Sequence, residues 1–248
     1  MKSIAFSLQK GGVGKTTLSA HIAWAAAEAG IETVLIDADP QGNTTSWLAK
    51  SPPRHELADV LNGSVKLPEA LMPIRDNLRL LGTFAIGGDL PKYDDARTML
   101  DQPHLFADLC DNLALLHFDL AVFDLSPGMG TLEQMVLKSV DEVITPLTPE
   151  FFSLDGIQIF KEALEDLNRK QRTNVLHRRI VANMINRSFR RHRSICREFE
   201  KLDYELFSVP QDSRMAEALL AHETVFEYAP DSRAVPELRR LAAAVAGA

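Results

Sequence analysis

The segment "SIAFSLQKGGVGKTT", residues 3–17, decides the fold of this 248-residue chain. Its apolar first part is typical of a buried strand, and a helix is expected to follow over residues 15–30. The glycines between them let the backbone curl, so that successive N–H groups and the helix N-terminus face one anion. Lys10 and Lys15 repel each other in such a loop unless a polyanion neutralises both. The segment therefore predicts a polyphosphate-binding loop.

The standard phosphate-loop pattern, GxxxxGK[ST], fails here at its first position, where Gln9 replaces glycine. The remaining octet, KGGVGKTT, keeps the chemistry of the loop. Lys15 is expected to reach the β- and γ-phosphates, and the Thr16 hydroxyl to ligate Mg²⁺. Thr17 is placed to contact the α-phosphate. The predicted phosphate-binding residues are Gly11, Gly12, Val13, Gly14, Lys15, Thr16 and Thr17.

The octet resembles the deviant Walker A motif, KGGxGK[ST]T, of the ParA/MinD group of P-loop ATPases. The resemblance implies ATP and Mg²⁺ as cofactors and a homodimer with ATP sandwiched between the subunits. In that dimer Lys10 would reach the phosphates bound by the partner. The resemblance also implies slow hydrolysis, with Lys10, Lys15 and Asp39 as the catalytic residues.

Two aspartates stand at the C-terminal end of the next expected strand, residues 32–38, in "LIDADPQGNTT" (35–45). Asp37 and Asp39 thus lie at the carboxyl edge, where open α/β sheets bind ligands. Taken alone, they are as consistent with turn or capping residues. The segment is similar to the ParA pattern D-x-DPQGN-x-T, which implies that Asp37 lies near the Mg²⁺ and Asp39 orients the attacking water. Residues 41–44 would then sense the γ-phosphate.

A second apolar strand with an acidic end, "FDLAVFDLS" (118–126), resembles a Walker B strand. Asp124 emerges at its tip and suits Mg²⁺, a hard cation that prefers oxygen ligands. The family continues this motif as D-x-P-P, whereas Ser126 stands here in the position of the first proline. The predicted metal-binding residues are Thr16, Asp37 and Asp124.

The segment "VPQDSRMAEA" (209–218) resembles the family's I-P-x-D loop, which contacts adenine. On that match Pro210 and Asp212 are expected at the base. Asn183 lies near the end of the preceding strand, where its side chain either contacts the edge of the base or has a purely structural role.

Residues 178–197 contain seven arginines and no acidic residue. A helix expected over 189–201 would place Arg190, Arg193 and Arg197 on one face. Such a face neutralises several DNA phosphates without reading sequence; the alternative is an ordinary solvated helix face. ParA-type ATPases bind DNA nonspecifically through this part of the chain, so the resemblance agrees. The predicted DNA-binding residues are Arg187, Arg190, Arg193, Arg197 and Arg214.

Apolar strands alternating with helices predict a single α/β domain over residues 1–248, with a mostly parallel twisted sheet and helices on both faces. Residues 50–77 are expected to be irregular, and 96–117 helical. The two cysteines are too far apart for a CxxC metal site or a disulfide framework. With no membrane span or secretory signal expected, the sequence predicts a cytoplasmic protein.

The resemblance implies a nucleoid-associated ATPase that positions or segregates DNA with a ParB-like activating partner, and no membrane binding. Two alternatives stay open: a ParA-like positioner of a protein cargo, such as a chemoreceptor cluster or microcompartment, and a MinD-like membrane-cycling ATPase. The second needs a basic amphipathic tail, and "PELRRLAAAVAGA" is rich in alanine. An iron–sulfur reductase is disfavoured because neither cysteine follows a nucleotide motif. Nothing favours a ligase on the same scaffold.

Overall fold

The computed structural model describes residues 1–247 and is built around one eight-stranded sheet. The strand order is β3-β4-β2-β5-β1-β6-β7-β8, and every neighbouring pair is parallel except β3 with β4. The strands are β1 (Lys2–Phe6), β2 (Thr33–Ala38), β3 (Leu71–Arg75), β4 (Leu78–Leu81), β5 (Leu120–Leu125), β6 (Glu142–Leu147), β7 (Leu176–Ile185) and β8 (Glu205–Pro210).

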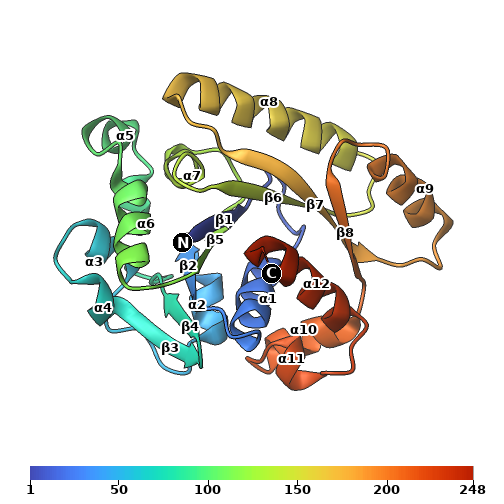
Figure 1. Cartoon of the computed structure of the whole chain (residues 1–248), viewed down its shortest axis with the longest axis horizontal. Coiled ribbons are helices and arrows are strands. Elements are labelled where there is room, and N and C mark those ends of the chain that lie inside the picture. The colour runs from blue at the N-terminus through green and yellow to red at the C-terminus, as the bar shows by residue number, and fades with distance from the viewer. Residues whose placement is uncertain (248) are drawn as a thin grey trace.

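Helices cover both faces of this sheet (Figure 1). They are α1 (Lys15–Glu28), α2 (Asn43–Leu48), α3 (Leu57–Leu61), α4 (Leu67–Ala70), the 3₁₀ helix η1 (Leu90–Tyr93), α5 (Ala96–Asp101), α6 (Leu105–Leu115), α7 (Thr131–Leu137), α8 (Ser153–Gln171), α9 (Arg190–Phe199), α10 (Ser213–Leu220), α11 (Val225–Tyr228) and α12 (Ala234–Ala246). Within residues 1–247, no helix is both long and apolar enough to cross a membrane.

The central strands are buried on both faces because their side chains alternate between two separate cores. Ile4 and Phe6 of β1 belong to the core shared with α1 and α12, whereas Ala5 belongs to the core under α6, α7 and α8. Helix α1 is rich in alanine, which lets it lie close to the sheet and to α12 at once. The predicted α/β architecture is confirmed.

The structure differs from the sequence-based expectations in three places. Residues 50–77 include β3, an edge strand that tolerates Pro73 because an edge has a free side. The helix expected over 96–117 is divided into α5 and α6 around Pro103, which lacks the N–H needed to continue it. Helix α7 follows the Walker B strand and was not foreseen.

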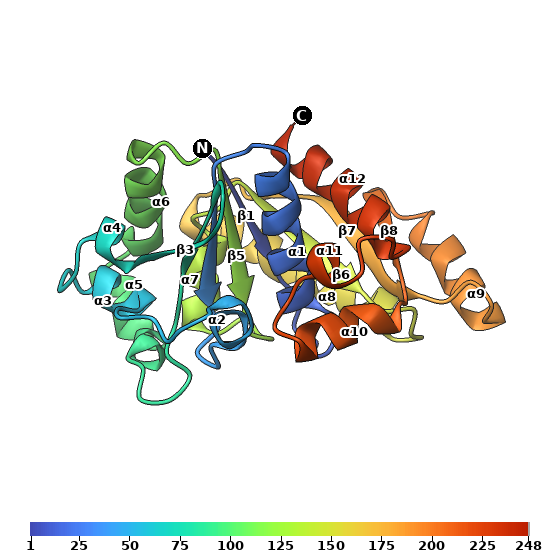
Figure 2. The same ribbon diagram turned by 90° about the horizontal axis from the view of Figure 1, so that it is seen from below.

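The parallel strands β1, β2, β5 and β6 all end at one edge of the sheet, so the loops after them lie together. These loops are residues 7–14, 39–42, 126–130 and 148–152. Helix α9 instead lies at the end of the molecule beyond β8 (Figures 1 and 2). The fold therefore separates the phosphate-loop motif from most of the arginine-rich segment.

Candidate functional site: a phosphate loop beside two buried carboxylates

The loop between β1 and α1 has the backbone geometry that its glycines allow. Gly12 and Gly14 have φ angles of 73° and 90°, in the left-handed region. Asn183 of β7 donates a hydrogen bond from Nδ2 to the Val13 carbonyl at 2.9 Å. A Cβ at Gly14 would lie 2.3 Å from the same nitrogen, so only glycine fits there. Asn183 thus joins the loop to the sheet, which agrees with the structural alternative for this residue.

Lys15 is held inside the loop rather than projecting from it. Its side chain is buried, and Nζ donates to the carbonyl oxygens of Lys10 at 3.1 Å and Leu8 at 3.4 Å. Burial lowers the pKa of Lys15, and the negative charges of Asp124, Asp39 and Glu133 oppose that shift. The ammonium group therefore sits in the loop with carboxylates around it.

Lys10 lies in a different environment only five residues earlier. Its side chain is 39% exposed and forms an ion pair with Glu150, in the loop after β6. An exposed ion pair of this kind contributes at most about 1 kcal/mol. The structure therefore places Lys10 at the surface of the loop, in a contact that is easily broken.

The predicted carboxylates meet where β2 and β5 pair, because Asp37 lies opposite Asp124 in register. Asp124 accepts a hydrogen bond at 2.7 Å from Thr44 Oγ1, and Asp37 accepts two from Thr45, at 2.8 Å from N and 2.6 Å from Oγ1. Burial, with the nearby charge of Asp124, raises the pKa of Asp37 to about 8. Burial also raises the pKa of Asp124 to about 6. Two buried carboxylates side by side favour a cation between them.

The residues present fit a magnesium ion that is completed by phosphate and water. Within residues 1–247, Oδ1 of Asp124 is buried and has no hydrogen-bond partner. No group of three or more metal-ligating side chains occurs in that part of the chain. Mg²⁺ commonly uses only one or two carboxylates together with substrate phosphates. The magnesium ion would be held by Thr16, Asp37 and Asp124. The Thr16 hydroxyl lies close enough to Asp124 to oppose, by hydrogen bonding, the rise in the pKa of that carboxyl caused by burial.

Asp39 lies beside this pair and faces the phosphate loop. Its side chain is buried, and Oδ1 accepts a hydrogen bond from the Gln41 N–H at 2.9 Å. Its charge acts on Lys15. The following residues form α2, whose Thr44 and Thr45 bond to both buried aspartates. Sequence reasoning included Thr44 but missed Thr45, although the doubled threonine after "DPQGN" was a visible signal.

A cavity of about 550 Å³ opens next to the phosphate loop, between α1, the ends of β7 and β8, and α10. It is lined by Thr17, Asn183, Pro210, Asp212, Met215 and Leu219, among others. The three residues predicted at the adenine base thus come together around one space. Its mixed polar and apolar lining is typical of a small-molecule pocket.

The carboxylate of Asp212 is already occupied in this pocket. Arg214 donates to it from Nε at 3.1 Å and Nη2 at 2.9 Å, and the Ser232 hydroxyl donates at 2.8 Å. The Arg214 guanidinium holds the pKa of this carboxyl well below its usual range. Arg214 also pairs with Asp231. Asp212 therefore shapes the pocket by fixing α10, and two carboxylates offset the charge of Arg214.

The arginine-rich segment divides into paired and unpaired residues. Arg179 bridges Glu142 and Glu205 in the sheet. Arg193 donates to the backbone carbonyls of Arg187 and Ser188. Six exposed arginines of the segment form no salt bridge with any carboxylate of residues 1–247, and these are Arg178, Arg187, Arg190, Arg191, Arg193 and Arg197.

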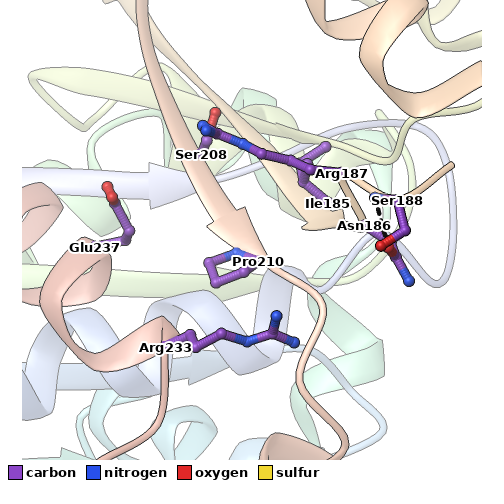
Figure 3. A pocket seen from close by; sticks show the side chains of 8 residues that line it. All are labelled: Ile185, Asn186, Arg187, Ser188, Ser208, Pro210, Arg233 and Glu237. Atoms are coloured by element: carbon purple, nitrogen blue, oxygen red, sulfur yellow. Dashed lines mark hydrogen bonds between the residues drawn. The ribbon is translucent and has the colours of Figure 1, made fainter. Parts of the chain in front are cut away.

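A smaller hollow of about 300 Å³ lies between this segment and the start of α12. Figure 3 shows Arg187 and Arg233 on opposite sides of Pro210 in its lining. Arg233 donates to the Gln211 carbonyl at 3.0 Å. The hollow is also lined by Glu237, which pairs with Arg240. Two guanidinium groups at one hollow are suited to an anionic group such as phosphate, and the Glu237 carboxylate offsets part of their charge.

Comparisons with known proteins agree with this geometry. A family model described as an AAA domain matches residues 1–177. "Chromosome-partitioning ATPase Soj" of Thermus thermophilus is 30% identical over 98% of this chain and 94% of its own length. "Uncharacterized protein BBD21" of Borreliella burgdorferi is 40% identical over 97% of this chain and 98% of its own length.

Solved structures share the same fold. The septum site-determining protein MinD of Pyrococcus horikoshii, solved as a complex with Mg-ADP, superposes with a TM-score of 0.78. It is 21% identical and covers 98% of this chain and 95% of its own. Together with the family match and the likeness to Soj, this confirms the resemblance first indicated by the octet at residues 10–17. The chain belongs to the ParA/MinD family of P-loop ATPases.

Proposed function

We propose that this protein is a Mg²⁺-dependent ATPase that dimerises around ATP and, as a dimer, binds duplex DNA without sequence preference. Its role would be to position or segregate DNA in the cytoplasm, in association with the nucleoid and with a ParB-like activating partner. The name of the Thermus relative, a chromosome-partitioning ATPase, supports this role.

The observation that carries the proposal is the setting of Lys15. Its buried ammonium group is held by two loop carbonyls and is acted on by the charges of Asp124 and Asp39, at the carboxyl ends of β5 and β2. Backbone N–H groups and a lysine at a helix N-terminus suit a polyphosphate, while Thr16, Asp37 and Asp124 suit the cation that accompanies it. Mg²⁺ would supply charge neutralisation for the phosphates when bound, and Asp39 would orient the water that attacks.

Dimerisation around ATP is supported by the position of Lys10. The side chain is half-exposed at the same edge as the phosphate loop, and among residues 1–247 it forms an ion pair with Glu150 alone. A bound triphosphate on a facing subunit offers Lys10 more negative charge than one carboxylate does, and in a site closed to water. Lys10 would therefore leave Glu150 when a second subunit presents ATP.

DNA binding is supported by the unpaired arginines near and on α9. Arg187, Arg190 and Arg197 are exposed and carry charge that no described carboxylate offsets, so they are free to meet phosphates. The hollow between Arg187 and Arg233 would take one phosphate of the backbone (Figure 3). We expect Arg193 to help by shaping the loop before α9, and Arg214 to contribute least because Asp212 and Asp231 offset its charge.

A MinD-like attachment to membranes is less consistent with α12. The apolar residues of this helix, including Leu238, Leu241 and Val245, are buried against α1 and the sheet. Two of its arginines also pair with Glu28 and Glu237. A helix whose apolar face is already covered has little area to insert into lipid.

The test is size-exclusion chromatography with ATP, ADP or no nucleotide, each with and without a random duplex. With ATP and no DNA, the wild-type protein is expected to elute as a dimer. When DNA is added, the protein should move to the DNA fraction in the presence of ATP, but not with ADP or without nucleotide. The Asp39→Ala variant should bind ATP but keep the dimer on DNA for hours, because hydrolysis would be lost.

Each part of the proposal has its own contrary result. A monomer with ATP bound contradicts the sandwich dimer, and an ATP dimer that does not shift with DNA contradicts the DNA role. Normal phosphate release by Asp39→Ala contradicts the assignment of Asp39. Retention on anionic vesicles but not on DNA would favour the membrane alternative.

A further inference from the structure

A hydroxyl group stands where the family pattern has a proline. Ser126 lies two residues beyond Asp124, and its Oγ donates a hydrogen bond to Oε1 of Glu133 in α7. Proline has neither a hydroxyl nor a backbone N–H and makes no such bond. The contact between Ser126 and Glu133 therefore belongs to this chain's own version of the loop.

Residues 126–130 and the first turn of α7 surround Glu133, which is only 6% exposed. A Cβ at Gly130 would lie 2.7 Å from Oε2 of Glu133 and 2.9 Å from Oδ1 of Asp94, so both carboxylates lie close to this glycine. Asp94 accepts the N–H of Thr131 at 2.8 Å and closes the loop from outside. Ser126 thus holds the Glu133 carboxylate, and Asp94 holds the backbone at the start of α7.

This loop faces the phosphate loop. Glycine has no Cβ, but the position that a Cβ on Gly11 would take lies 3.9 Å from Cγ of Pro127. The two loops are therefore adjacent at this point. The charge of Glu133 also acts on Lys15, beside the charges of Asp124 and Asp39. In the proposed function Asp124 binds the Mg²⁺ and Asp39 orients the attacking water, whereas Glu133 does neither. It is an additional negative charge at a site that must receive phosphate.

Like charges in a site of low dielectric repel strongly, and the repulsion grows as they approach. ATP places its γ-phosphate against Lys15 and the loops that follow β2 and β5, and ADP has no γ-phosphate. A fixed carboxylate on this side therefore opposes the triphosphate more than the diphosphate.

We propose that Glu133, held in place by Ser126, weakens the binding of ATP relative to ADP. This inference rests on the proposed function, because it assumes that the loop binds both nucleotides. Glu133 is then a specificity-determining residue, and Ser126 is its positioning residue. The pair limits how long the triphosphate state persists, independently of hydrolysis.

The test measures Kd for Mg-ATP and Mg-ADP by competition with a fluorescent nucleotide, at protein concentrations below dimer formation. Glu133→Gln keeps the shape of the side chain and an oxygen to accept from Ser126 but removes the charge. It is expected to raise the ratio of ATP affinity to ADP affinity roughly tenfold. Ser126→Ala is expected to raise it about threefold in the wild type, because Glu133 is no longer held, and not at all in Glu133→Gln.

Glu162→Gln is the matched control, because it removes one exposed carboxylate on α8. Partial loss of folding lowers both affinities together and leaves the ratio unchanged. If Glu133→Gln leaves the ratio at the wild-type value while both nucleotides bind, the inference is wrong and the proposed function stands. If Ser126→Ala acts equally in both backgrounds, Ser126 does not position Glu133. If the wild type binds neither nucleotide, the proposed function itself has failed.

Discussion

The phosphate loop and the arginine-rich segment both carry positive charge, but they hold it in opposite ways. In the loop, Lys15 is buried against two carbonyls and Lys10 is paired with Glu150. Beyond β7, Arg187, Arg190 and Arg197 extend from the surface without a salt bridge to any carboxylate of residues 1–247. One region fixes its cations, and the other leaves them free.

This difference predicts what each region recognises. A fixed ammonium group inside a shaped loop selects a ligand by geometry, so small changes there should abolish binding. Free guanidinium groups attract any phosphate backbone, so changes there should act gradually and depend on salt. The two regions should therefore be separable by mutation, with one controlling nucleotide and the other DNA.

The largest effect is expected from Lys15→Ala. Loss of the buried ammonium group removes charge-assisted contacts with the phosphates, and ATP affinity should fall about 1000-fold or more, measured by calorimetry. Lys10→Ala is the matched control, because it removes the same charge five residues earlier. It should keep ATP binding by the monomer within a few-fold and lose only the ATP dimer. Equal losses in the two variants would contradict the distinction between a buried and a surface lysine.

The same contrast explains which parts of the molecule could be predicted from sequence. The phosphate loop follows one buried strand, and Asp37 and Asp124 lie at the carboxyl ends of two others, so their meeting at one edge follows from a parallel sheet. The fold itself was predictable for the same reason. The division at Pro103 and the strand around Pro73 depended on tertiary context that local patterns do not contain.

Two side chains near the site, Glu133 and Glu150, had no usable signal in the sequence, whereas Thr45 had one that was missed. Glu133 lies in the first turn of α7 and Glu150 in the loop after β6, and each is defined by a partner across a turn or distant in sequence. Thr45 bonds to Asp37 only because α2 forms after the aspartates. Composition alone indicated the seven arginines, and it did not reveal that Arg179 is a structural residue in the sheet.

The arginine region is tested by replacing Arg190, Arg193 and Arg197 together with alanine. Loss of the phosphate contacts of Arg190 and Arg197, and of the loop held by Arg193, should weaken DNA binding by the ATP form about 100-fold at 0.1 M salt and reduce the salt dependence. ATP affinity should stay unchanged. A control that removes three cations from α8, at Lys161, Arg169 and Lys170, separates this surface from net charge. If that control weakens DNA binding equally, α9 is not the contact surface.

The smallest effect concerns the free energy of unfolding and its dependence on pH, and it involves His21 of α1, the helix that follows the phosphate loop. His21 is fully buried, contacts the Thr17 carbonyl through Nδ1 at 2.6 Å and accepts the Val225 N–H at Nε2 at 2.9 Å. The accepting Nε2 requires the neutral ring. Burial lowers the pKa of His21 to about 4.

A histidine whose pKa is lower in the folded than in the unfolded state stabilises the fold fully above about pH 6.5, and this stability is lost as the pH falls toward 4. Between pH 7 and 4.5 the loss attributable to His21 is about 2.5 kcal/mol. The free energy of unfolding of the nucleotide-free protein, measured with urea, should therefore change between pH 7 and 4.5 by about 2.5 kcal/mol less in His21→Gln than in the wild type. Asp37 and Asp124 contribute with the opposite sign, but they are present in both proteins and cancel in the comparison. His104→Gln, which removes an exposed histidine, is the control. An unchanged pH dependence in His21→Gln would mean that the helix behind the phosphate loop is not fixed through this ring.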